Sequence, residues 1–399
     1  MNGIEWTFAE AGKWLGGVLP AGWFSDSFIN GIIAGISGII VFVPQIMILF
    51  GLITLLEDTG YMARISFLTD KIMRKAGLNG KSVMPMVSGL ACAVPAIMSA
   101  RSIENKKERL LTIMCTPLMS CSARLPVYTV LIALVIPHKM YFGFISLQGM
   151  VMMLMYFLGT FMALIAAYVM KWFIKSSEKS FFILELPAYR GPRWKNILTT
   201  MIERAKIFVV QAGKVIMVIS LLLWVLSTYG PPEKMKAVTT KYATLVQQNP
   251  SQSGEYHKLE ATDHLENSYA GMLGKAIEPV IRPLGYDWKI GIALITSFAA
   301  REVFVGTMAT LYSVGDNTDE NSETLRQKMN AATWPNGDKV YTLAAGLSLL
   351  VFYALAMQWM STLAVVKRET HTWKWPVIML VYMTGLAYVM SFITFHLFK

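Results

Sequence analysis

Long apolar runs constrain this chain more than any other feature of its sequence. Six runs are long enough to supply the roughly 20 residues that a helix needs to cross the hydrocarbon core of a membrane. They fall at 29–56, 110–136, 149–170, 207–229, 342–366 and 376–397. The chain of 399 residues is 54% hydrophobic and only 15% charged, which excludes an ordinary soluble domain. The sequence therefore predicts an all-α fold, that of a polytopic membrane protein.

Two further apolar stretches, 80–100 and 288–313, are interrupted by small residues and carry charge or proline. An interruption of this kind frees backbone groups, which the membrane interior tolerates only where protein or water surrounds them. We expect each stretch to form a hairpin of broken helices, lining a cavity.

The formal net charge of +11 is better explained by membrane topology than by nucleic-acid binding, because the basic residues cluster in short connections. Lysine and arginine outnumber acidic residues in 101–109, 171–206 and 367–374, whereas acids outnumber bases in 230–287 and 314–341. Basic loops stay on the cytoplasmic side of a membrane. We therefore place the first three segments inside, the other two outside, and expect no nucleic-acid partner.

An internal repeat appears at an offset of 208 residues, where Arg74 falls on Arg282 and Gly77 on Gly285. With the topology above, the two copies would be inverted. Many secondary transporters have this architecture, with sites where the broken helices of the two copies meet. Because few residues are identical, two unrelated amphipathic stretches with chance matches remain the alternative.

These features divide the chain into five parts. They are an interfacial segment, 1–28; a first gate-type repeat, 29–136; a connecting membrane helix with a basic cytoplasmic loop, 137–206; a second repeat, 207–313, with an outer loop at 230–287; and an outer loop followed by two C-terminal membrane helices, 314–399.

Two interruptions carry thiols, at Cys92 and at Cys121. A pair of thiols suits a soft or borderline cation such as Fe(II), Cu(I) or Zn(II), whereas Mg(II) and Ca(II) require several oxygen ligands. Cys92 and Cys121 are therefore the candidate metal ligands; the alternative is that each is a small packing residue. The polar residues of the same interruptions are Ser88, Ser120, Ser122 and Arg124.

Two charged pairs are further candidates for a pore or a gate. Glu57 and Asp58 end an apolar run, where they would attract a cation or simply form a solvated helix end beside Arg64. Arg301 and Glu302 lie within the second repeat, and ionisable residues inside a membrane are functional candidates by default. We favour the reading in which this second pair braces the broken helix.

Taken together, several of these segments resemble the ferrous iron transport protein B family. The matching segments include Leu56 to Arg64, Gly80 to Ser82, Cys92 to Met98, Met119 to Pro126 and Ala300 to Glu302. The resemblance implies two gate repeats and uptake of Fe(II) through the bacterial inner membrane, with the first-gate cysteines as ligands. It also implies no catalytic residues in this chain, no permanently bound cofactor, and Fe(II) as the transported substrate.

The chain departs from the family at several places. Members usually begin with a cytosolic GTP-binding domain, so we expect a fragment or a separately encoded permease that is not itself an enzyme. Its expected partners are membrane lipid, Fe(II), a cytosolic GTP-binding domain or protein, and further copies of itself. Ala93 stands where family hairpins often have asparagine, and Trp359 where some members have cysteine.

Two other function classes compete with Fe(II) transport. Another solute, such as a nucleoside or a different divalent metal, would use the same gate repeats, but a nucleoside site calls for aromatic and amide groups rather than thiols. An intramembrane enzyme would need a convergent nucleophile and base, yet the histidines near spans, His138, His371 and His396, all lie at span ends.

The charge distribution predicts the sidedness of the loops. An epitope tag between Lys175 and Lys195 should be protected in intact cells, and a tag between Pro250 and Gly254 should be labelled from outside, because clustered basic residues orient short loops. Labelling of both tags from the same side would contradict the inverted-repeat topology.

Overall fold

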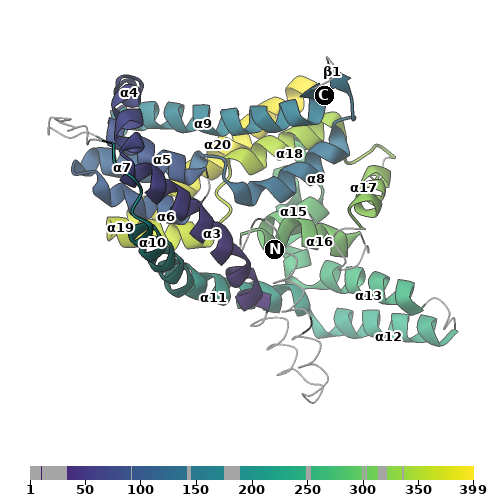
Figure 1. The fold of residues 1–399 in the computed structure, drawn as a ribbon. Coiled ribbons are helices and arrows are strands. Elements are labelled where there is room, and N and C mark those ends of the chain that lie inside the picture. The colour runs from purple at the N-terminus through teal and green to yellow at the C-terminus, as the bar shows by residue number, and fades with distance from the viewer. Residues whose placement is uncertain are drawn as a thin grey trace. The chain divides into compact units, whose positions relative to one another are not determined.

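The computed structural model describes residues 10, 34–90, 92–141, 145–174, 189–248, 253–298, 301, 303–312, 321–334 and 337–399. Most of this part of the chain is helical (Figure 1), which confirms the predicted all-α class. Its only strands are β1 (Met140–Tyr141) and β2 (Ile145–Ser146), a two-residue antiparallel pair in which Met140 lies opposite Ser146.

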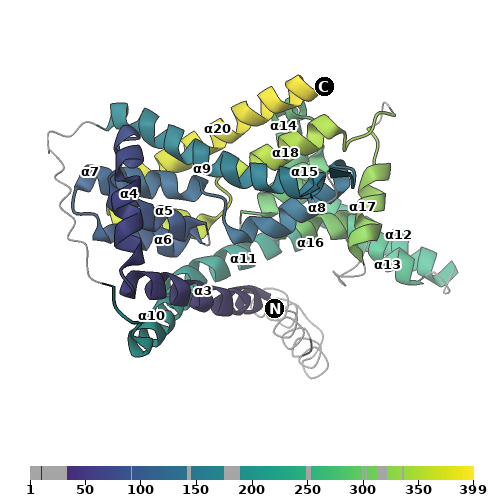
Figure 2. The ribbon, with the colours of Figure 1, turned by 45° about the horizontal axis from the view of Figure 1, so that its top comes forward.

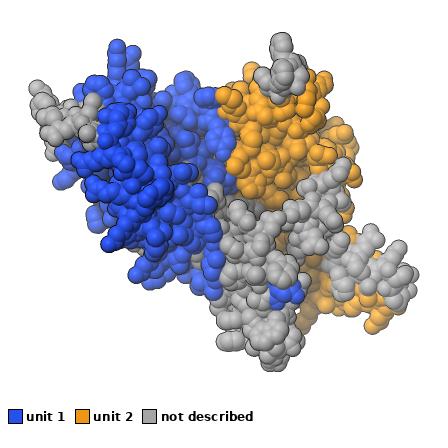
Figure 3. Space-filling view, viewed as in Figure 1, with its two compact units in different colours: residues 1–123, 156–220, 360–383 blue, residues 124–155, 221–359, 384–399 orange. Residues whose placement is uncertain are grey.

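The chain forms two compact units, shown in different colours in Figure 3. Unit 1 comprises residues 1–123, 156–220 and 360–383, and unit 2 comprises 124–155, 221–359 and 384–399. All three basic segments belong to unit 1, and both acidic connections belong to unit 2. The two compact units therefore also separate the basic segments of the chain from its acidic connections.

Among the described residues, four helices are long and apolar enough to cross a membrane. They are Lys106–Val135, Leu147–Phe173, Leu343–Thr370 and Lys374–Phe398. Each of them passes once from one unit to the other along the chain. These helices indicate a multi-pass membrane protein.

In unit 1, α3 (Ala34–Asp58) and α4 (Tyr61–Lys75) meet at an angle of 82° between Ile46–Asp58 and Tyr61–Lys75. Gly60 makes this turn with φ 79°, a left-handed conformation that favours glycine. Helix α10 packs along α3, as Figure 2 shows. The other elements that begin in unit 1 are η2 (Gly80–Ser82), α5 (Val83–Gly89), α6 (Ala93–Ser99), η3 (Ala100–Ser102), α7 (Lys106–Cys115), η4 (Thr116–Leu118), η5 (Ser122–Arg124), α10 (Trp194–Ile207), the π-turn η6 (Phe208–Ala212), α11 (Gly213–Thr228), α19 (Met360–Thr370) and α20 (Lys374–Phe398).

In unit 2, the described part of the connection 230–287 is mostly helical, and its first two helices, α12 (Pro232–Gln248) and α13 (Ser253–Asn267), form a hairpin (Figure 1). Its third helix, α14 (Tyr269–Ile281), packs against α15 (Trp288–Thr296), the first arm of the second hairpin. The elements that begin in this unit are α8 (Leu125–Val135), β1, β2, α9 (Leu147–Phe173), α12 (Pro232–Gln248), α13 (Ser253–Asn267), α14 (Tyr269–Ile281), η8 (Arg282–Leu284), α15 (Trp288–Thr296), α16 (Val303–Leu311), α17 (Asn321–Ala331) and α18 (Leu343–Leu355).

The backbone supports the repeat that the sequence suggested. Gly77 and Gly285, which the offset of 208 superposes, both adopt left-handed conformations, with φ 84° and 82°. Two residues later the next helical segment is capped in the same way. Asn79 accepts a hydrogen bond from Ser82 N at 3.1 Å, and Asp287 accepts one from Ile290 N at 2.8 Å. Each copy therefore enters its hairpin through the same turn and cap.

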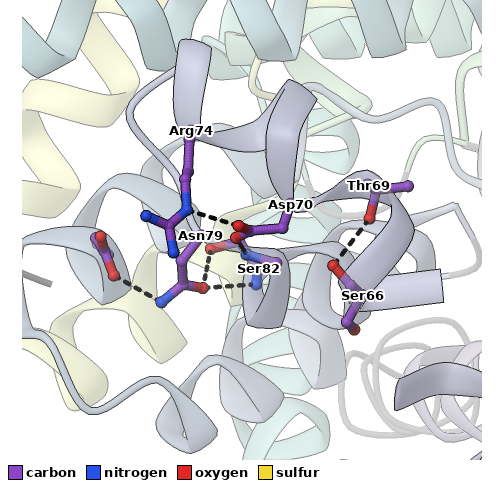
Figure 4. A network of polar contacts seen from close by, with 8 residues as sticks. Ser66, Thr69, Asp70, Arg74, Asn79 and Ser82 are labelled. Atoms are coloured by element: carbon purple, nitrogen blue, oxygen red, sulfur yellow. Dashed lines mark hydrogen bonds and ion pairs between the residues drawn. The ribbon is translucent and has the colours of Figure 1, made fainter. Parts of the chain in front are cut away.

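A polar network holds the entry to the first hairpin (Figure 4). Asn79 Nδ2 donates to Glu108 Oε2 at 2.6 Å, which joins the cap of η2 to α7. Asp70 accepts hydrogen bonds from Arg74 Nε at 2.6 Å and from the backbone N–H of Gly80 at 2.8 Å. These bonds tie α4, η2 and α7 together before the chain enters the hairpin.

Replacement of the cap tests this anchoring. Asn79→Ala should lower the free energy of unfolding by about 1–2 kcal/mol, because it removes both the cap and the bond to Glu108. Asn196→Ala is the matched control: Asn196 bonds Asp58 at an exposed position, so this change should cost about 0.5 kcal/mol or less. Thermal unfolding of the purified protein in detergent measures both. Equal effects would show that the Asn79 network does not anchor the hairpin.

Candidate functional site

The first hairpin breaks between α5 and α6. Helix α5 ends at Gly89, and α6 begins at Ala93 after Cys92 adopts an extended backbone, with φ −152° and ψ 130°. Pro95 lies in the first turn of α6, where its missing N–H costs no helical hydrogen bond. The small residues and the proline therefore place the break where the sequence predicted it.

The second break separates η4 from η5 and α8. Met119 is extended, with φ −58° and ψ 132°, and Pro117 and Pro126 each lie in the first turn of the helix that follows them. Proline at these positions favours the start of a helix and disfavours continuation of the preceding one. Cys121 consequently lies in a short non-helical segment between two helices.

The two thiol-bearing breaks contact each other directly. The backbone N–H of Ser122 donates to the carbonyl of Leu90 at 3.1 Å, which joins the second break to the first. Among the described residues neither Cys92 nor Cys121 forms a disulfide, and both are buried, with exposed fractions of 7% and 5%. The structure therefore brings together two segments that lie about 30 residues apart in the chain. We expect the two Sγ atoms to lie within roughly 10 Å of each other, close enough for one ion to bridge them with modest movement.

The serines of this region differ in environment. Ser88 Oγ donates to the Met84 carbonyl of its own helix at 2.8 Å. Ser120 is fully buried, whereas Ser122 is partly exposed. Arg124, which begins the part of this segment that belongs to unit 2, is also fully buried.

Gly159 supports the second break and was not singled out from the sequence. A Cβ atom at Gly159 in α9 would lie 2.6 Å from Ser120 Oγ and 3.0 Å from the Leu118 carbonyl oxygen. The backbone of α9 thus passes directly against the segment that carries Cys121. A glycine within a long apolar run gives no signal of such a contact, because the partner lies about 40 residues away.

Glu57 and Asp58 lie at the end of α3 before the 82° turn. The Glu57 side chain is exposed, and the Asp58 carboxylate accepts hydrogen bonds from Asn196 Nδ2 at 3.0 and 3.1 Å. Asp58 therefore joins the end of α3 to α10. A role for either residue at a pore mouth stays a prediction.

The second hairpin has the same plan as the first. Helices α15 and α16 flank a break, and the hydroxyl groups of Thr296 and Thr307 hydrogen-bond across the two arms at 2.9 Å. Arg301 lies in the break and is buried, with 6% exposure. Glu302, the other predicted residue of this pair, lies outside the described residues.

No group of three or more His, Cys, Asp or Glu side chains gathers at one point in the described residues.

The comparisons with known proteins agree with this geometry. The Gate family model, described as nucleoside recognition, matches residues 39–135 and 209–373, more than half of the chain. The chain belongs to the Gate family. The two matched segments contain the two hairpins, one each. A second model, ferrous iron transport protein B C terminus, matches residues 152–204, which include most of α9 and most of α10.

Curated relatives of this Gate-family chain carry iron-transport names, and the predicted resemblance to ferrous iron transport protein B is confirmed. The Fe(2+) transporter FeoB of Leptospira biflexa is 43% identical over 100% of this chain and 54% of its own length. That of Staphylococcus aureus is 37% identical over 96% of this chain and 50% of its own length. The Fe(2+) transport protein A/Fe(2+) transporter FeoB fusion protein of Porphyromonas gingivalis is 36% identical over 99% of this chain. The chain spans about half the length of these relatives, and no solved structure matches it significantly.

Substitution of Gly159 tests the support of the second break. Gly159→Ala should lower the free energy of unfolding by about 1–3 kcal/mol, because the new methyl group meets backbone atoms that cannot move aside without strain. Gly306→Ala is the matched control, since a Cβ atom there has no neighbour within 4 Å. Thermal unfolding in detergent compares the two, and a Gly159→Ala protein as stable as the control would contradict the close contact.

Proposed function

We propose that this Gate-family chain is the permease part of a ferrous iron uptake system in the bacterial inner membrane. The observation that carries the proposal is the hydrogen bond from Ser122 N to the Leu90 carbonyl, which unites the breaks that hold Cys92 and Cys121. The names of the relatives support Fe(II) as the substrate.

The chemistry of the two breaks fits a ferrous ion better than a harder cation. Fe(II) accepts thiolate ligands, whereas Mg(II) and Ca(II) require a shell of oxygen atoms. In this proposal Cys92 and Cys121 replace part of the hydration shell of the ion, and backbone carbonyl groups and water supply the remaining ligands. The short non-helical segments allow those carbonyl groups to turn toward the ion.

Transport in this proposal depends on a GTP-binding domain or protein at the cytoplasmic face. The relatives are about twice as long as this chain, which leaves room in them for a further domain. The basic segments of unit 1 would form the face that meets this partner. A second copy of the chain remains a further candidate partner.

Substitution of the cysteines in proteoliposomes tests the proposal. Cys92→Ser and Cys121→Ser should each reduce Fe(II) uptake by about tenfold or more, because a hydroxyl group is nearly isosteric with a thiol but a poorer ligand for this metal. Cys115→Ser is the matched control. Cys115 is fully buried at the end of α7 rather than in a break, so uptake should stay within about twofold of the parent protein.

The assay is run with and without an added GTP-binding domain from a relative, and the amount of inserted protein is measured for every variant. Uridine and Mg(II) are offered as competing solutes. Parent-level uptake by both Cys92→Ser and Cys121→Ser would refute the ligand assignment. Uptake of uridine in place of iron would favour the nucleoside alternative that the Gate description suggests.

A further inference from the structure

In unit 2, as in unit 1, two breaks between helices contact each other. The span Leu343–Thr370 is interrupted: α18 ends at Leu355 and α19 begins at Met360, with Ala356 in an extended conformation between them. Arg301, in the break of the second hairpin, donates from Nη2 to the Ala356 carbonyl at 3.4 Å. The rings of Phe304 and Tyr353 pack nearby with centroids 4.9 Å apart. These contacts join the second hairpin to the broken span.

Several polar atoms at this meeting point are buried without partners. Arg301 Nε and Nη1 form no hydrogen bond, and neither do Nε2 and Oε1 of Gln358. The Gln358 side chain is 1% exposed and that of Arg301 is 6% exposed. The Tyr353 hydroxyl faces the side chains of Gln358 and Ser297 but makes no hydrogen bond of good geometry with either. Buried polar groups are rarely left in this state, and an additional molecule bound here would satisfy them.

Among the described residues, the charge at this point is positive. Arginine stays protonated in proteins, and within the described residues no carboxylate forms an ion pair with Arg301. Helix α16 begins at Val303, two residues later, and the N-terminus of a helix attracts negative charge. A cation such as Fe(II) would be repelled here. A bound anion, in contrast, would balance the charge of Arg301 and accept hydrogen bonds from the unpaired donors.

We propose that the second hairpin binds a small oxyanion, of the carboxylate or hydrogencarbonate class, between Arg301 and Gln358. Arg301, the Gln358 amide and the Tyr353 hydroxyl donate to its oxygen atoms. The Gln358 Oε1 atom accepts from the hydroxyl group of hydrogencarbonate or from a water bound with a carboxylate. The bound anion neutralises the guanidinium and leaves the second hairpin without net charge at this point. The site is independent of the proposed metal ligands.

Binding of hydrogencarbonate and formate to the purified full chain in lipid nanodiscs tests this site. Thermal unfolding and titration calorimetry are measured at increasing concentrations of each anion at constant ionic strength. The parent protein should be stabilised saturably by both anions. Gln358→Leu should weaken their binding by about tenfold, the loss expected for one or two hydrogen bonds to a charged ligand.

Arg301→Met should abolish binding, and Arg301→Lys should restore part of it because the charge returns without the planar group. Arg193→Met, at an exposed position of unit 1, is the control and should bind like the parent protein. Should Arg301→Met fail to fold, Gln358→Leu and Arg301→Lys decide the question.

Three outcomes would overturn the proposal. They are the absence of saturable binding by the parent protein, binding by Gln358→Leu and Arg301→Lys equal to that of the parent, and equal stabilisation by chloride, which would contradict an oxyanion site. Glu302→Gln adds a further check: if Glu302 supplies the counter-charge instead, this variant should gain anion binding that the parent protein lacks.

Discussion

The need to satisfy backbone hydrogen bonds inside a membrane governs this structure. A helix that stops within the hydrocarbon region leaves N–H and carbonyl groups that lipid cannot pair. In unit 1 the Ser122 N–H donates a hydrogen bond to the Leu90 carbonyl, and this bond joins two breaks that are far apart in the chain. In unit 2 the Arg301 guanidinium donates a hydrogen bond to the Ala356 carbonyl, and this bond joins two other breaks. The places where helices end are therefore paired with one another, and those pairs are the candidate sites.

The entry to each hairpin is fixed by local chemistry that the two copies share. Gly77 and Gly285 turn the chain, and Asn79 and Asp287 cap the helical segment that follows. The two hairpins then diverge in their polar content. The first has Cys92 at its break, whereas the second has Arg301, so the same backbone device carries side chains of different chemistry.

Much of this arrangement could be predicted from the sequence, because it depends on residues whose effects are local. Apolar runs, prolines and small residues located most of the spans and the breaks at Cys92 and Cys121. Other features depend on contacts between distant segments. The break at Ala356 has no proline or glycine to signal it, and the contact of Gly159 with Ser120 joins residues from separate helices. The bond from Tyr382 Oη to the Met114 carbonyl is equally non-local.

The repeat illustrates the same limit. Identity between the copies is too thin to exclude chance, yet the conformation of two glycines and the geometry of two caps make the correspondence plain. The fold class follows from a pattern of many residues, whereas a site depends on contacts between a few distant segments. Side-chain packing and the need to pair backbone hydrogen-bonding groups determine which segments come into contact.

The proposal that Cys92 and Cys121 together bind a ferrous ion in transit can be tested by X-ray absorption at the iron edge of the anaerobic protein loaded with Fe(II) in nanodiscs, because sulfur and oxygen ligands scatter differently. We expect sulfur scatterers in the first shell of iron in the parent protein and in Cys115→Ser, and their loss when Cys92 and Cys121 are both replaced by serine. A first shell of oxygen and nitrogen alone in the parent protein would contradict it.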